Sequence, residues 1–105
     1  MTRPLYGIAA ALLVAAASGA DAETLRVEVK GLKYSPASLE AHVGDVIEWV
    51  NKDFVVHTAT ARNGAWDVNL PAEGSGHVEA KTPGLIEYYC RYHPNMTATV
   101  KISPR

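Results

Sequence analysis

Residues 85–103 read Leu-Ile-Glu-Tyr-Tyr-Cys-Arg-Tyr-His-Pro-Asn-Met-Thr-Ala-Thr-Val-Lys-Ile-Ser. From Leu85 to Cys90 the residues alternate, with Ile, Tyr and Cys on one face, and from Thr97 to Ser103 apolar and polar residues alternate again. This period of two is that of a β-strand with one buried face. Because a short connection joins the two runs, we expect neighbouring strands whose connecting loop lies at one end of the domain.

The same period continues through the chain before this segment, and turn signals separate the runs. Asn63-Gly64 in particular predicts a tight hairpin, because both residues tolerate positive φ angles. No run keeps a helical period for three turns. Seven or eight short strands at intervals of about ten residues predict an all-β fold, a two-sheet antiparallel sandwich. The strands expected before residue 85 are 25–29, 39–41, 46–51, 55–61, 65–70 and 78–80.

Residues 1–22 have the layout of a secretory signal peptide: Arg3 supplies a positive charge, Leu5 to Ala17 an apolar run, and Ala20-Asp21-Ala22 a cleavage signal. The apolar run is too short to span a bilayer, and an uncleaved N-terminal membrane anchor is the alternative. One small domain, residues 23–105, remains after removal of this segment. A signal peptide without a lipidated cysteine predicts a soluble periplasmic protein.

The charges of residues 23–105 exclude two classes of partner. Nine Lys and Arg residues stand against ten Asp and Glu residues, and they form no basic run. Nucleic-acid binding by counterion release needs a cluster of cations, as does binding to an anionic membrane surface. We therefore expect no nucleic-acid partner, and no membrane insertion once the signal peptide is removed.

Cys90 is the one cysteine of the chain. It has no disulfide partner within the chain, although small exported domains often depend on disulfides. Taken alone, it could be a buried inert thiol, half of an intermolecular disulfide or a dispensable surface residue. Its sequence neighbours favour a fourth interpretation.

His93 and Met96 follow Cys90 at a spacing of three, and His57 lies upstream in another expected strand. A loop between adjacent strands keeps sulfur, imidazole and thioether at one end of a sandwich, where they can converge. Two imidazoles, one thiolate and one thioether are the donors of a blue-copper electron-transfer site. Cu(I) favours soft sulfur and Cu(II) is well served by imidazole, so a rigid mixed set suits both states. His42 and His77 lack such neighbours and are expected to be solvated.

At Cys90, His93, Pro94 and Met96 the sequence resembles the cupredoxin family of type 1 blue copper proteins, and the spacing is most similar to that of the amicyanins. The resemblance covers residues 23–105 and implies a Greek-key sandwich with one copper ion that alternates between Cu(I) and Cu(II). It also implies equatorial ligation by His57, Cys90 and His93 and axial ligation by Met96. Thr58 departs from the family, which usually has Asn after the first ligating His and uses it to link the two ligand loops.

By the same resemblance, the protein carries single electrons between redox proteins, namely a c-type cytochrome, a dehydrogenase or both, and is a monomer. His93 is the expected port for electrons, with Leu70, Pro71 and Pro94 as a surrounding apolar patch suited to a transient contact. Tyr89 offers a second, remote route.

The same residues could serve three other functions. An enzyme would use Cys90 as a nucleophile activated by His57 or His93, but that role explains neither Met96 nor the short loop. A copper carrier or chaperone without an electron-transfer role is the stronger alternative, although such proteins tend to have sites rich in Met or Cys. A structural zinc site is disfavoured because a thioether is a poor zinc ligand.

Overall fold

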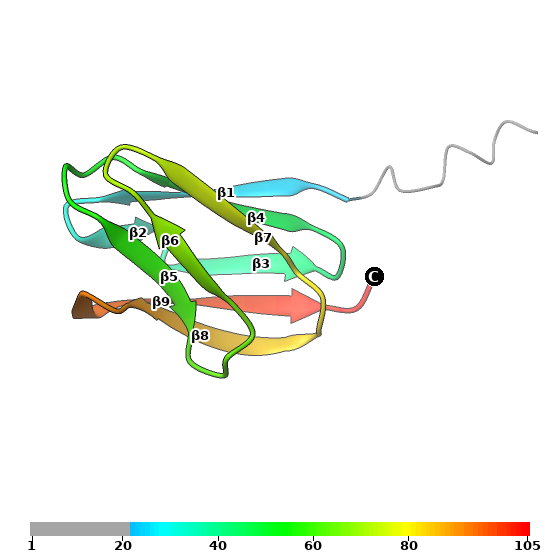
Figure 1. Cartoon of the computed structure of the whole chain (residues 1–105). Helices are drawn as coiled ribbons and strands as arrows, with labels where there is room; N and C mark the ends of the chain where they lie inside the picture. The colour runs from blue at the N-terminus through cyan, green and yellow to red at the C-terminus, as the bar shows by residue number, and fades with distance from the viewer. Residues whose placement is uncertain (1–21) are drawn as a thin grey trace, which may run out of the picture.

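A computed structural model describes residues 22–105, which form two packed β-sheets (Figure 1). The strand order is β2-β1-β4-β7 in one sheet and β3-β9-β8-β5-β6 in the other. Within these residues there is no helix of the length and apolarity needed to cross a membrane. The predicted signal peptide, residues 1–22, lies outside the described residues except for its last position. The strands are β1 (Thr24–Lys30), β2 (Lys33–Ser35), β3 (Ser38–His42), β4 (Val46–Asn51), β5 (His57–Ala61), β6 (Asp67–Leu70), β7 (Ser75–Glu79), β8 (Gly84–Cys90) and β9 (His93–Ser103).

The all-β sandwich is confirmed, with two corrections. The described residues hold nine strands instead of seven or eight, because Gly31 and Leu32 take φ values of 62° and 63° and turn the chain so that β2 pairs back on β1. The sheets are also not purely antiparallel, since β1 pairs with β4 and β3 pairs with β9 in parallel. Each parallel pair joins strands that are separated in sequence by other elements, as parallel pairing requires.

The core lies between the two sheets and contains the side chains that the period of two predicts. Trp49 of β4 and Tyr88 of β8 are fully buried, and their rings meet edge to face with centroids 5.4 Å apart. Tyr34 of β2 packs against Tyr88 in the same way at 4.8 Å. Burial raises the pKa of Tyr88 to about 12, so the phenol stays neutral. Fully burying a large apolar side chain contributes about 1.5–3 kcal/mol, so this cluster is a main source of stability.

The hairpin at Asn63-Gly64 is present, but it is longer than the two-residue turn that the dipeptide predicts. Ala61 donates its N–H to the carbonyl of Trp66 at 2.9 Å, which leaves residues 62–65 in the loop. Gly64 has the expected positive φ of 82°. Asn63 does not have the expected positive φ, and it stabilises the loop through its side chain, whose Oδ1 accepts the N–H of Ala65 at 2.9 Å.

The hairpin between β8 and β9 is tighter than the sequence suggests. Cys90 pairs with His93, so only Arg91 and Tyr92 form the turn, and β9 begins at His93. The register shifts between Tyr89, which pairs with Thr97, and Cys90, so residues 94–96 pair with no residue of β8. Pro94 is tolerated at this irregularity because β3, in the described part of the chain, pairs with β9 only from Thr99 onward. Sheet pairing therefore holds Cys90 and His93, whereas Met96 lies in the irregular segment that follows them.

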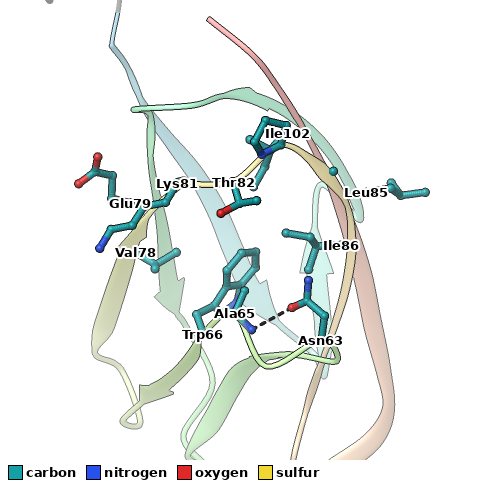
Figure 2. A pocket seen from close by; sticks show the side chains of 12 residues that line it. Asn63, Ala65, Trp66, Val78, Glu79, Lys81, Thr82, Leu85, Ile86 and Ile102 are labelled. Carbon is teal, nitrogen blue, oxygen red and sulfur yellow. Dashed lines mark hydrogen bonds between the residues drawn. The ribbon is translucent and has the colours of Figure 1, made fainter.

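A cavity of about 350 Å³ lies at the other end of the sandwich, around the start of β8 (Figure 2). Trp66, Val78, Ile86 and Ile102 line it with mostly apolar surface. Because Ile86 lines this cavity and Cys90 ends β8, the second half of that strand separates the cavity from the expected metal donors.

Asp45 closes the same far end, where β4 begins. Its carboxylate accepts the N–H groups of Glu23 at 3.0 Å and His42 at 2.8 Å and is paired with Arg105. Burial works to raise the pKa of Asp45, but the two hydrogen bonds and the Arg105 charge together hold it below 3.8. Asp45 therefore stabilises the fold above its ordinary pKa, and this contribution is lost as the pH falls through the lowered value.

We expect Asp45→Asn to lower the free energy of unfolding near pH 7 by about 1–3 kcal/mol, because one N–H acceptor and the ion pair are lost. Urea unfolding of both proteins measures the difference, and the gap should shrink as the pH falls through the lowered pKa of Asp45 and the native carboxylate is protonated. Equal stability near pH 7, or a gap that does not change with pH, would contradict this role.

Candidate metal centre

Three side chains with metal-binding atoms converge at the end of the sandwich that holds the β8–β9 turn. The Cys90 thiol lies 3.7 Å from Nδ1 of His57 and 3.6 Å from Nδ1 of His93. One donor atom from each residue lies within 4.8 Å of the other two. His57 and Cys90 are fully buried and His93 is half-buried, so the three donors lie around one point that faces solvent only on the side of His93. They could hold a single ion.

Met96 lies on the same strand as His93, three residues further along, and is 4% exposed. It lines a surface hollow of about 420 Å³ together with His93. The structure thus brings all four expected donors to one end of the domain. The other residues that line this hollow are Leu32, Tyr92, Pro94 and Asn95.

The Cys90 sulfur sits in a buried environment that supplies one N–H donor. Thr58 donates its backbone N–H to Sγ of Cys90 at 3.4 Å. The carbonyl of Thr58 in turn accepts the Tyr34 hydroxyl at 2.5 Å. Burial, with the nearby Cys90 thiol as a second cause, raises the pKa of Tyr34 well above its ordinary value, so Tyr34 remains a donor. This contact fixes the strand on which His57 lies.

Thr58 also links the two segments that carry the expected donors, at the position where the resemblance implies Asn. Its hydroxyl accepts the N–H of Arg91 at 2.9 Å and contacts the Thr60 hydroxyl at 2.8 Å. The Thr60 hydroxyl donates to Oδ1 of Asp67 at 2.7 Å. Nε of Arg91 donates to the same oxygen at 3.2 Å, so the hydrogen bonds form a closed ring that returns to Arg91. The hydrogen bond from Thr60 lowers the pKa of Asp67, whereas burial raises it and the Arg91 contact lowers it again. The pKa of Asp67 is therefore below its usual value. The threonine hydroxyl therefore provides the expected link by another route.

Asp53 is a part of the site that the sequence analysis missed. Its Oδ2 lies 2.8 Å from Nε2 of His57, the ring nitrogen that faces away from the other donors. The same carboxylate accepts the N–H groups of Gly31 at 2.8 Å and Leu32 at 3.1 Å. Burial works to raise the pKa of Asp53, but these hydrogen bonds and the His57 ring lower it overall. An acidic residue four positions before His57 was the signal available in the sequence.

Asn51 holds the loop that carries Asp53. Its side-chain amide lies within 2.9–3.1 Å of the carbonyl oxygens of Val55, Leu70 and Pro71, and its Oδ1 accepts the N–H of Asp53 at 2.9 Å. Because Asn51 is 1% exposed, these contacts are shielded from water. The loop before His57 is therefore anchored to the end of β6.

The apolar surface around His93 differs from the expected one. Leu70 is fully buried, because β6 turns it inward opposite His57, so its expected place in a surface patch is wrong. Pro71 and Pro94 are exposed as expected. Leu32 and Tyr92, each about half exposed, border His93 instead.

The other residues considered in the sequence are His42, His77 and Tyr89. His42 and His77 are exposed on β3 and β7, and their solvated state is confirmed. Tyr89 is half-buried on β8, and the Arg62 guanidinium lies 4.4 Å from the centre of its ring. This stacking gives Tyr89 a packing role at the surface.

A family model described as a cupredoxin-like domain matches residues 5–102. The chain belongs to the cupredoxin family. No curated protein sequence matches it. The family match begins inside the predicted signal peptide, so the boundary at residue 22 stays a prediction.

Solved cupredoxin structures share the fold at low sequence identity. An oxidised methionine-to-leucine mutant of amicyanin aligns at a TM-score of 0.67 with 22% identity, over 75% of this chain and 81% of that chain. A purple cupredoxin from Nitrosopumilus maritimus gives 0.67 and 24%, over 75% and 99%. The reduced state of a proline-to-phenylalanine mutant of amicyanin gives 0.66 and 23%, over 85% and 89%. The cupredoxin fold and the arrangement of His57, Cys90, His93 and Met96 fit a single type 1 copper site.

We expect Thr58→Val to destabilise the metal-free protein by about 1–2 kcal/mol, because the N–H of Arg91 and the Thr60 hydroxyl lose a buried partner. Denaturant unfolding measures this loss. Thr58→Ser keeps the hydroxyl and is the matched control, with a smaller effect. A valine variant as stable as the serine variant would show that the link between the two segments contributes nothing.

Proposed function

We propose that this cupredoxin is a periplasmic blue copper protein that carries single electrons between redox proteins, with copper held by His57, Cys90, His93 and Met96. The observation that carries the proposal is the convergence of two imidazole Nδ1 atoms and one thiol within 4.8 Å. Met96, which lines the same hollow as His93, would supply the weak thioether donor of such a site. The donor types match those of blue-copper sites, and the thioether disfavours zinc.

Bound copper supplies a reversible one-electron couple between Cu(I) and Cu(II), and the protein keeps the donors in place for both states. Sheet pairing holds Cys90 and His93, and the Thr58 hydroxyl ties their turn to the strand of His57. Asn51 anchors the loop before His57. Because the strands and the loop that carry His57, Cys90 and His93 are cross-linked in this way, little needs to move when an electron arrives, which favours rapid exchange.

The burial of the donors argues against the alternative functions. A nucleophilic cysteine must reach its substrate, whereas Cys90 is fully buried, as is His57. A copper carrier must release its ion to an acceptor, and here only His93 among the three clustered donors reaches the surface. These features support an electron carrier that is neither an enzyme nor a copper donor.

The hollow beside His93 supports this residue as the port for electrons. Leu32, Tyr92 and Pro94 give it an exposed apolar border, and such a small apolar contact suits a weak and transient redox encounter. A c-type cytochrome, a dehydrogenase or both are the proposed partners of the monomer.

We expect the Cu(II)-loaded protein to be intensely blue through thiolate-to-copper charge transfer, and Cys90→Ser to be colourless. Visible absorption spectra of both proteins measure this, and circular dichroism of the variant checks that it still folds. A colourless copper-loaded wild type would contradict the proposal. Reversible voltammetry of the wild type then separates an electron carrier from a copper carrier, since only the former needs a stable couple.

We expect Pro94→Glu to slow electron self-exchange roughly tenfold, because a charge in an apolar contact weakens the encounter of two molecules. NMR line broadening in mixtures of the two oxidation states measures the rate. Leu85→Glu is the matched control, because Leu85 is 74% exposed at the opposite end of β8. An unchanged rate in Pro94→Glu, or an equal loss in both variants, would contradict a port at His93.

A further inference from the structure

We propose that Asp53 is a positioning residue of the metal centre, which holds His57 with Nδ1 toward the copper and favours Cu(II) over Cu(I) by its negative charge. The inference rests on the proposed function, because it concerns the electronic tuning of the same site. The carboxylate contacts no proposed ligand atom and acts through the imidazole ring.

The two nitrogens of the His57 ring have separate partners. Nε2 lies 2.8 Å from Oδ2 of Asp53, whereas Nδ1 lies 3.7 Å from the Cys90 sulfur. An ionised carboxylate can only accept a hydrogen bond, so the ring proton belongs on Nε2. The lone pair is then on Nδ1, which faces the other donors. Because His57 is fully buried, its contacts within the protein select this tautomer, and solvent does not.

The carboxylate is itself fixed. Oδ1 accepts the N–H of Gly31 at 2.8 Å, and Oδ2 accepts the N–H of Leu32 at 3.1 Å. Both donors come from the turn between β1 and β2, where the positive φ angles aim consecutive N–H groups at one point. Asp53 therefore joins the β1–β2 turn to the strand of His57 and cannot rotate away from the ring without breaking these contacts.

A negative charge one imidazole ring away from the ion affects the two copper states unequally. It attracts the divalent state more strongly than the monovalent state, and the hydrogen bond makes His57 a more basic ligand. The Asp53 side chain is 17% exposed, so solvent screens its charge only in part. Both effects lower the reduction potential of the site.

Asp53→Asn tests the inference, because Asn is nearly isosteric and removes the charge. We expect about a tenfold smaller preference for Cu(II) over Cu(I), which for a one-electron couple is a potential higher by ~59 mV. Protein-film voltammetry measures the potential. Glu73→Gln is the matched control: Glu73 donates its backbone N–H to the carbonyl of Asp53 at 3.1 Å, but its side chain is exposed. This control should leave the potential nearly unchanged.

A second measurement does not depend on the folding of a variant. In the diamagnetic Cu(I) form of the wild type, nitrogen-15 NMR should show His57 protonated at Nε2, with slow solvent exchange of that proton. Protonation at Nδ1, or rapid exchange at Nε2, would overturn the inference.

The outcomes separate the two proposals. A blue wild type whose potential equals that of a folded, blue Asp53→Asn variant would overturn the role of Asp53 alone. An equal shift in Asp53→Asn and Glu73→Gln would reduce that role to general surface charge and would also overturn it. A wild type that binds copper without blue colour would overturn the proposed function and, with it, this inference.

Discussion

Cys90 pairs with His93 across a two-residue turn, and the strand that ends at Cys90 lies between the strands that carry the two histidines. This arrangement brings three donors together without a long loop, because the order β9-β8-β5 places their strands side by side. The inward face of β8 also carries Tyr88, which packs at the centre of the aromatic core. The same strand thus anchors the core and the candidate metal centre, so a shift in its register would disturb both.

Buried donors near a metal need partners that keep them in one orientation, and here hydrogen bonds from three directions provide them. Thr58 joins the strand of His57 to the β8–β9 turn, and Asn51 joins the preceding loop to β6. Asp53 joins that loop to the β1–β2 turn and to the His57 ring. These contacts exist within the protein itself, so the site need not be assembled by the metal. A pre-arranged site is what a protein that alternates between two copper states requires.

The period of two predicted most strands and the inward faces of β8 and β9, because one side of each is buried. It could not predict β2, which exists because two consecutive residues take positive φ, nor the parallel pairs, which depend on contacts between distant segments. The donors were predictable because three of them lie within seven residues of one another. The burial of Leu70 could not be predicted, because it depends on the pairing of Leu70 with His57 across two strands. The spacing of four between Asp53 and His57 allows their contact but does not require it, because the contact depends on the path of the loop between them.

In the proposed function, two imidazoles and one thiolate bind a single copper ion in both oxidation states with little rearrangement. X-ray absorption spectroscopy at the copper edge tests it most directly, on the oxidised and the reduced protein in turn. We expect two nitrogen donors and one short sulfur donor in each state, with nearly the same distances. A spectrum without the short sulfur donor, or a change in the number of donors on reduction, would contradict it.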